Sequence, residues 1–189
     1  LGDEFMLIND KENLKKHIEN GSEEEIEEVI EEILNDCIDD EKRINNFNYI
    51  CEILRSNNKR IDTLFIIGLC PDYILSECIE NLVYITDDLF YLKSLNLYPT
   101  ALKKVEKQIM KNDEEYFKKH MANILRYSIT YNKNLVIDIL YMIFKEVCEN
   151  EKVPFYSVDF YQSGSFSKVY SVGNKIIKVG NEREKTFFK

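Results

Sequence analysis

The hydrophobic pattern of this chain changes its period near Pro154, and this change constrains the fold more than any other feature. Before Pro154 apolar residues recur every three or four positions, as in α-helices, and after it they alternate, as in β-strands. With 189 residues, 44% of them apolar, the chain can bury a core without disulfides. The sequence predicts a mainly α fold, either a multi-helix bundle or an irregular helical-repeat stack, followed by a small antiparallel β-meander.

This pattern divides the chain into three parts. Residues 1–5 precede Met6 and have the character of residues added by cloning, so Met6 is the expected native start. Residues 6–152 form the predicted helical domain, and residues 153–189 form the predicted β-meander. Bundle and repeat stack remain alternatives, because no repeat period recurs.

The segment that begins at Ser22 gives the clearest helix prediction. Ser22 and Glu25 have the spacing of a capping box, and an apolar stripe runs from Ile26 to Cys37. Residues 64–69 are apolar nearly all round, which predicts a central buried helix that Pro71 ends. The full set of predicted helical segments is 10–20, 22–37, 44–54, 64–69, 73–85, 87–95, 100–110, 113–127 and 135–147.

Net charge and cysteine content limit which partners and which cell compartment are expected. The formal net charge of -9, with no basic stripe, disfavours nucleic acid and anionic membrane surfaces, and no apolar run is long enough to span a bilayer. The five cysteines are odd in number and form no C-x-x-C pair, which indicates reduced core residues of a cytoplasmic protein. The expected partner is therefore another protein.

The helical domain offers no recognisable chemistry. His17 and His120 are the only histidines, and neither has a cysteine or carboxylate at metal-ligand spacing. Both are interpreted as ordinary helix residues. No catalytic group and no metal ligand is predicted, and the helices are expected to bind or position another molecule.

After Pro154 apolar and polar residues alternate in short runs separated by turn residues, which predicts a set of strands. Strands are predicted at 155–161, 166–172 and 175–179, joined by the turns 162–165 and Gly173-Asn174. The charge pattern of residues 182–189 then suits the first turns of another helix. Two successive hairpins predict an antiparallel meander.

The stretch YQSGSFSKVYSVGNKIIKVG resembles the start of the small lobe of a eukaryotic-type protein kinase or pseudokinase. In that family a glycine-rich loop joins the first two strands, and a lysine lies on the third. The resemblance implies a nucleotide site in which the glycine lets backbone N–H groups approach the phosphates, the valine covers the adenine and the lysine contacts the α- and β-phosphates. The residues that match this site are Gly164, Phe166 at the loop tip, Val169 and Lys178.

The sequence departs from the kinase pattern in two respects. Gln162 and Ser167 occupy the first and third glycine positions, so that only the middle glycine is kept. The chain also contains no H-R-D catalytic loop and no D-F-G metal site, so it cannot by itself catalyse phosphoryl transfer. The resemblance implies ATP as the cofactor of a complete Ser/Thr protein-kinase-like parent, with Glu182 or Glu184 as the acid that pairs with the lysine.

Three functions remain in competition. The first is the N-terminal part of a longer kinase-like protein, whose helices form a regulatory or protein-binding region, and the abrupt end of the chain within an expected helix favours it. The second is a short decoy that mimics or occupies a host kinase. The third is a helical adaptor or scaffold with a purely structural hairpin. Under the first two, an apolar lobe surface should pack on the helices or form a homo-oligomer through Ile176, Ile177, Phe187 and Phe188.

Overall fold

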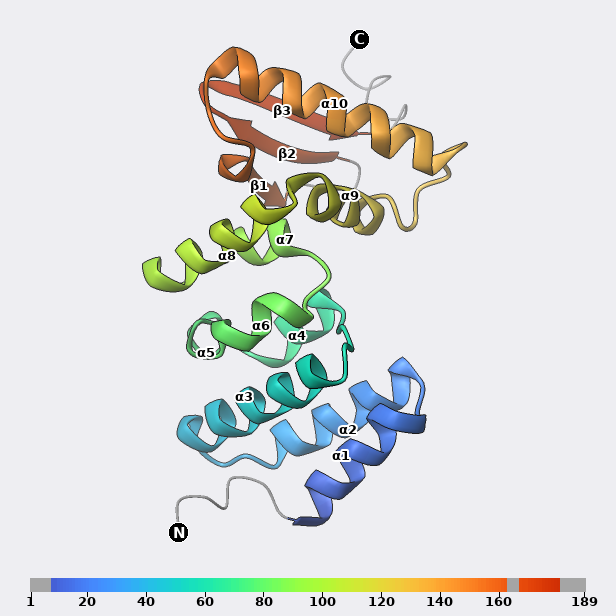
Figure 1. Ribbon diagram of the computed structural model, residues 1–189, viewed down its shortest axis with the longest axis vertical. Helices are drawn as coiled ribbons and strands as arrows, with labels where there is room; N and C mark the ends of the chain where they lie inside the picture. Colours follow the sequence, from blue (N-terminus) through green and yellow to red (C-terminus); the bar gives the residue numbers. More distant parts are fainter. Residues whose placement is uncertain (1–7, 163–166, 181–189) are drawn as a thin grey trace. The chain divides into compact units, whose positions relative to one another are not determined.

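The computed structural model of the protein describes residues 8–162 and 167–180 (Figure 1). Over these residues the chain is mainly helical, with ten α-helices followed by a three-stranded antiparallel sheet, which confirms the predicted fold class. The helices are α1 (Ile8–Asn20), α2 (Glu23–Asn35), α3 (Asp40–Ser56), α4 (Thr63–Leu69), α5 (Asp72–Glu77), α6 (Ile79–Ile85), α7 (Leu89–Lys93), α8 (Pro99–Lys111), α9 (Asp113–Ile124) and α10 (Lys133–Glu151).

The chain folds as two compact units. Of the described residues, unit 1 contains those up to Asp87 together with Asn96–Lys104, and unit 2 contains Asp88–Leu95 and those from Val105 onward. The change of period near Pro154 therefore lies inside unit 2, where the strands share a core with α7, α9 and α10.

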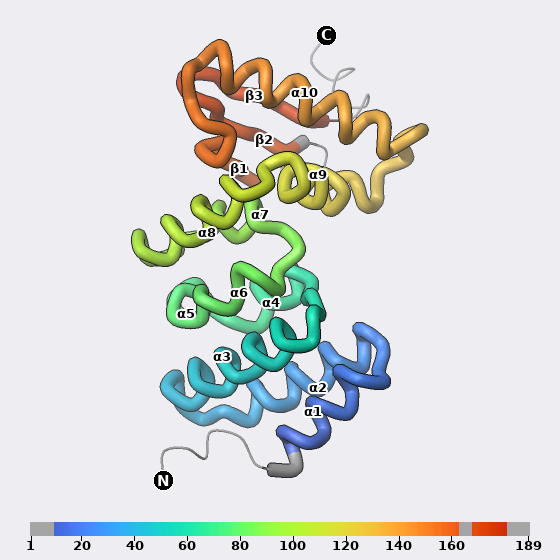
Figure 2. The backbone as a smooth tube through the Cα atoms, in the orientation of Figure 1, coloured from blue at the N-terminus to red at the C-terminus, as the bar shows by residue number. Residues whose placement is uncertain are grey.

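Unit 1 begins with two helices that lie side by side and meet at Gly21 (Figure 2). The predicted capping box is present at the start of α2: the Ser22 hydroxyl accepts from the Glu25 backbone N–H at 3.2 Å, and the Glu25 carboxylate accepts from the Ser22 N–H at 3.3 Å. The predicted stripe is buried over Ile26, Val29, Ile30, Ile33 and Leu34. Local capping and periodicity thus fix this helix.

Two helix predictions in unit 1 are wrong in detail. The segment 73–85 forms two helices rather than one, because Cys78 leaves helical geometry with ψ at 13°. The break lets each short helix bury its own apolar face. The segment predicted as a central buried helix, α4, buries only Thr63 and Ile66 and leaves Leu64 48% exposed.

Unit 2 has an aromatic core centred on Phe117 of α9. Its ring lies 5.8 Å from Phe90, 4.8 Å from Phe144 and 5.2 Å from Phe155, measured between centroids. The pairs with Phe90 and Phe155 meet edge to face, the arrangement that the ring quadrupole favours. This cluster joins α7, α9, α10 and the segment before the sheet.

The first predicted strand is shorter than expected. Phe155–Ser157 is a 3-10 helix, and β1 extends only over Asp159–Gln162. The turn brings Phe155 and Val158 into the core together, whereas residues three apart in an extended strand lie on opposite faces. Core burial therefore overrides the alternating pattern.

The sheet has the strand order β1-β2-β3, with β2 at Ser167–Val172 and β3 at Lys175–Gly180, and both pairings are antiparallel as predicted. Gly173 begins the two-residue turn between β2 and β3 and has a φ of 56°, a conformation that glycine adopts without strain.

All five cysteines are free and buried, as predicted. Among the described residues no three or more His, Cys, Asp or Glu side chains are grouped so that they could hold a metal ion. None of the described helices is both long and apolar enough to cross a membrane.

Candidate functional site

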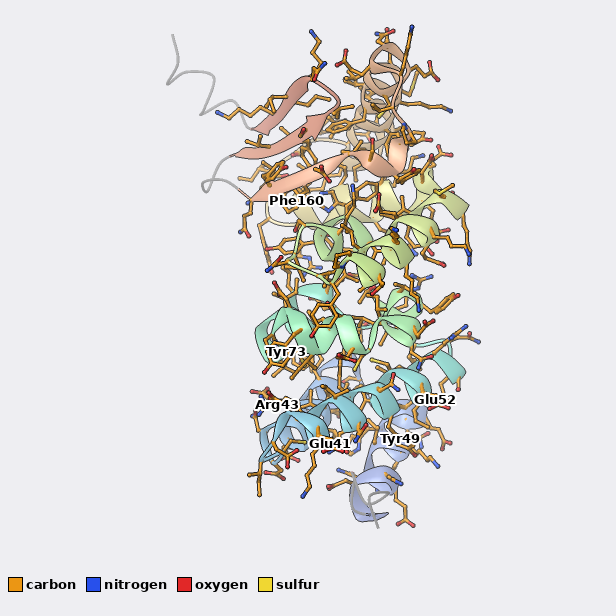
Figure 3. The ribbon with its side chains drawn as sticks, turned by 90° about the vertical axis from the view of Figure 1, so that its left-hand side faces the viewer. Glu41, Arg43, Tyr49, Glu52, Tyr73 and Phe160 are labelled. Carbon is orange, nitrogen blue, oxygen red and sulfur yellow. The ribbon has the colours of Figure 1, made fainter. Side chains whose placement is uncertain are left out.

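One face of the sheet is covered by helices. The cross-strand row Phe160, Tyr170 and Ile177 points to this side, and the first two side chains are almost completely buried. Phe160, labelled in Figure 3, lies 5.3 Å from the Tyr170 ring, and Phe144 of α10 meets that ring edge to face at 5.1 Å. The helices thus define an inner and an outer side of the sheet.

The opposite side, which we call the open face, carries the residues that alternate with this row. Tyr161, Val169 and Lys178 are directly opposite one another on β1, β2 and β3, and Ile176 lies two residues before Lys178 on β3. Tyr161 is 56% exposed and Ile176 is 68% exposed, while Val169 is half-buried and Lys178 exposed. The open face therefore combines apolar surface with a cation.

The structure brings together two of the four residues in the predicted nucleotide site. Val169 and Lys178 are cross-strand partners, and such partners project to the same face with their Cβ atoms about 5 Å apart. Gly164 and Phe166 lie outside the described residues. The same holds for Glu182, Glu184, Phe187 and Phe188.

The two adjacent isoleucines of β3 behave differently. Ile177 faces the helices and is half-buried, whereas Ile176 is on the open face. Of the two expected roles, packing on the helices or self-association, packing on the helices does not hold for Ile176, because neighbouring residues in a strand point to opposite faces.

A chain of three buried, hydrogen-bonded side chains anchors β2 on the helix-covered side of the sheet. His120 of α9 places its Nδ1 2.8 and 2.9 Å from the two Asp88 carboxylate oxygens, and its Nε2 lies 2.7 Å from the Tyr170 hydroxyl. Asp88 caps α7 by accepting from the Tyr91 N–H at 2.9 Å. Because Tyr170 lies between Val169 and Ser171, this chain fixes the strand that carries Val169.

Burial sets the protonation state of Tyr170 at the end of this chain. Burial, with a smaller contribution from Asp88, raises the pKa of Tyr170, so that its phenol stays protonated. If the phenol donates to His120 Nε2, the ring proton is on Nδ1 and is donated to Asp88. Asp88, His120 and Tyr170 are each at most 2% exposed, which closes them to a substrate and gives them a structural role.

Two side chains of α7 anchor β1. The Lys93 ammonium donates to the Val158 carbonyl at 2.9 Å and to Asp159 Oδ1 at 2.8 Å, with only 5% of the lysine side chain exposed. The Tyr91 hydroxyl donates to Gln162 Oε1 at 2.6 Å. Gln162 is the residue at the first glycine position of the kinase pattern, so its side chain is held at the end of β1.

Sequence reasoning missed most of this arrangement. His120 is not an ordinary helix residue, and its only local signal is that it shares a helix face with Phe117 and the buried Tyr116. Asp88 precedes the apolar residues Leu89 and Phe90, which is the position of a helix cap. Tyr161 and Ile176 follow from strand alternation once the register is known.

Comparisons with protein-family models, with curated proteins and with solved structures found no match for this chain.

Proposed function

We propose that the open face of the sheet is a nucleotide-binding face of the protein-kinase type, attached to helices that serve as a protein-interaction or regulatory region. The observation that carries this proposal is the pairing of Val169 with Lys178 on the side of the sheet that no described helix covers. The chain binds the nucleotide without catalysing phosphoryl transfer, because its sequence holds no H-R-D or D-F-G motif.

The chemistry of this face suits an adenine nucleotide. Adenine is flat and largely apolar, and Val169 and Ile176 supply apolar surface on neighbouring strands. The phosphates carry negative charge, and the Lys178 ammonium, two residues from Ile176, supplies a cation. The open face therefore offers an apolar contact for the base and, at a separate position, a charged contact for the phosphates.

The hydrogen bonds on the helix-covered side of the sheet support nucleotide binding by keeping the open face rigid. The Asp88, His120 and Tyr170 chain holds β2, and Lys93 holds β1 at Asp159. A face that is ordered before the ligand arrives loses less conformational entropy on binding. The anchors contribute affinity in this way without touching the nucleotide.

Nucleotide binding can be tested with a fluorescent ATP analogue. We expect saturable binding, weakened about tenfold or more by Lys178→Met, which equals about 1.4 kcal/mol. Lys175→Met is the matched control, since Lys175 is exposed on the same strand but pairs with Val172 on the other face. The absence of saturable binding, or an equal loss in both variants, would contradict the proposal.

A second candidate is a helical adaptor whose sheet is structural or docks a protein. The exposure of Tyr161 and Ile176 favours it, because an apolar sheet face suits a protein partner as well as a base. It predicts that ATP leaves the amide resonances of Val169 and Lys178 unchanged. Resonance shifts confined to the open face would instead support the nucleotide.

A further inference from the structure

The loop between α9 and α10 exposes its large apolar and aromatic side chains and partly buries its small polar ones. Tyr127, Ile129 and Tyr131 are each at least 90% exposed, while the polar Ser128 and Thr130 that alternate with them are half-buried. Surface loops normally turn polar groups outward, and exposed apolar clusters mark interaction sites. The loop leads into the N-terminal end of α10 (Figure 1), and it presents three large side chains to solvent.

Hydrogen bonds hold the loop in this conformation. The Ser128 hydroxyl lies 2.6 Å from the Thr130 hydroxyl and 3.0 Å from the Leu125 carbonyl oxygen. Lys133 donates to the Arg126 carbonyl at 3.1 Å and ties the loop to the first turn of α10. The outward direction of the apolar side chains is therefore built into the loop.

An apolar stripe continues from the loop along the outer side of α10. Its four members are between 45% and 68% exposed and recur at i, i+4, i+7 and i+8, the spacing of one helix face. The opposite face of the same helix supplies Tyr141 and Phe144 to the core of unit 2. The stripe consists of Leu135, Ile139, Met142 and Ile143.

We propose that the α9–α10 loop and this stripe form a two-fold interface in which the α10 helices of two copies of the chain pack antiparallel. The seven exposed side chains offer on the order of 900 Å² at about 180 Å² for each full side chain, close to the roughly 800 Å² per partner of a stable interface. An isologous contact needs only one such patch on each copy.

Charge selects the antiparallel orientation. Glu146 and Glu149 are exposed at the C-terminal end of the stripe, where they outnumber the exposed Lys145, whereas Arg126 and Lys133 lie at its N-terminal end. Parallel helices would place the glutamates of the two copies against each other. Antiparallel helices place them near the partner's basic end, and they also oppose the two helix dipoles favourably.

Oligomeric state tests the proposal. Sedimentation equilibrium of the full chain should show a monomer–dimer equilibrium, and Met142→Glu should raise the dimer dissociation constant at least about tenfold. Met110→Glu is the matched control, because Met110 is 60% exposed on α8, outside the stripe. A monomer at all concentrations, or a dimer that Met142→Glu leaves intact, overturns the proposal.

Cross-linking tests the orientation. The centre of the stripe lies between Ile139 and Met142, so the antiparallel pairing brings these two positions together from different copies. A mixture of the Ile139→Cys and Met142→Cys variants should then form disulfide-linked heterodimers on oxidation, while the five native thiols stay buried. Links formed only within each variant alone would indicate parallel helices and overturn the arrangement. The result is independent of nucleotide binding.

Discussion

Tyr170 shows how one buried polar side chain constrains the sheet. Its hydroxyl is the last member of a chain that begins at Asp88, the cap of α7, and passes through His120 of α9. Each buried donor and acceptor in such a chain loses its water on folding and depends on its neighbour for a replacement. The strand is therefore held by specific hydrogen bonds in addition to the aromatic contacts around its ring.

Replacing Tyr170 by Phe should destabilise the protein although the ring is retained. The change leaves His120 Nε2 buried without its partner, which costs about 1–3 kcal/mol. Urea unfolding followed by circular dichroism measures this loss. Tyr161→Phe is the control on the neighbouring strand: its side chain is 56% exposed, and its stability should change by less than about 0.5 kcal/mol. Equal effects of the two changes would exclude a structural role for the polar chain.

At the scale of elements, glycine is required at the β2–β3 turn and dispensable in α4. Gly173 has a φ of 56°, and a Cβ there would meet Glu151 Cβ at 3.0 Å. The Glu151 carboxylate also accepts from the Asn174 N–H at 3.0 Å, so this side chain is not free to withdraw. Gly68 lies in helix α4, and apart from its chain neighbours and the backbone of its own helix no heavy atom lies within 4 Å of its Cβ position.

The two glycine-to-alanine changes should therefore act in opposite directions. Gly173→Ala should cost about 1–2 kcal/mol, since an L-residue is strained at positive φ. Gly68→Ala should stabilise by about 0.5–1 kcal/mol, because alanine loses less backbone entropy in a helix. Denaturant midpoints of the two variants measure both effects. A stabilising Gly173→Ala would mean that the turn adopts another conformation in solution.

At the scale of the whole molecule, buried thiols link stability to alkaline pH. Burial raises the pKa of Cys70 and Cys78 from the ordinary value of 9.0 to about 12, and that of Cys148 to about 11. The pKa of Cys51 is raised as well, again first by burial. In the unfolded chain these thiols ionise near pH 9, whereas in the folded chain they stay protonated.

The sign of the pH dependence follows from this difference. Above pH 9 the unfolded state binds fewer protons than the folded state, so the stability that is fully present below pH 9 is lost as the pH rises toward 12. Each thiol contributes at most about 1.4 kcal/mol per pH unit. Urea unfolding between pH 8 and pH 11 should show the decline, and Cys78→Ala should make it less steep. A constant unfolding free energy over this interval would contradict the assignment.

The sequence predicted the elements that local chemistry fixes. The capping box of Ser22 and the stripe of α2 are short-range patterns, and the Gly173 turn follows from a residue preference at a single position. The two-residue turn also fixes the register of β2 and β3, so the pairing of Val169 with Lys178 is encoded within the ten residues from Val169 to Lys178.

The remaining features depend on tertiary packing. The split at Cys78 and the 3-10 turn at Phe155 arise because distant core positions must be filled, and no local pattern specifies those positions. His120 lies 32 residues from Asp88 and 50 from Tyr170, so only the folded chain brings them together.

The sequence by itself thus determined most of the succession of helices, the meander and the pairing of Val169 with Lys178, because capping, periodicity and turn preference act over a few residues. Only the tertiary structure decided which sheet face is covered, which polar groups anchor it and which side of α10 stays exposed. These features depend on contacts between segments far apart in the chain, whose free energies arise only when the core forms.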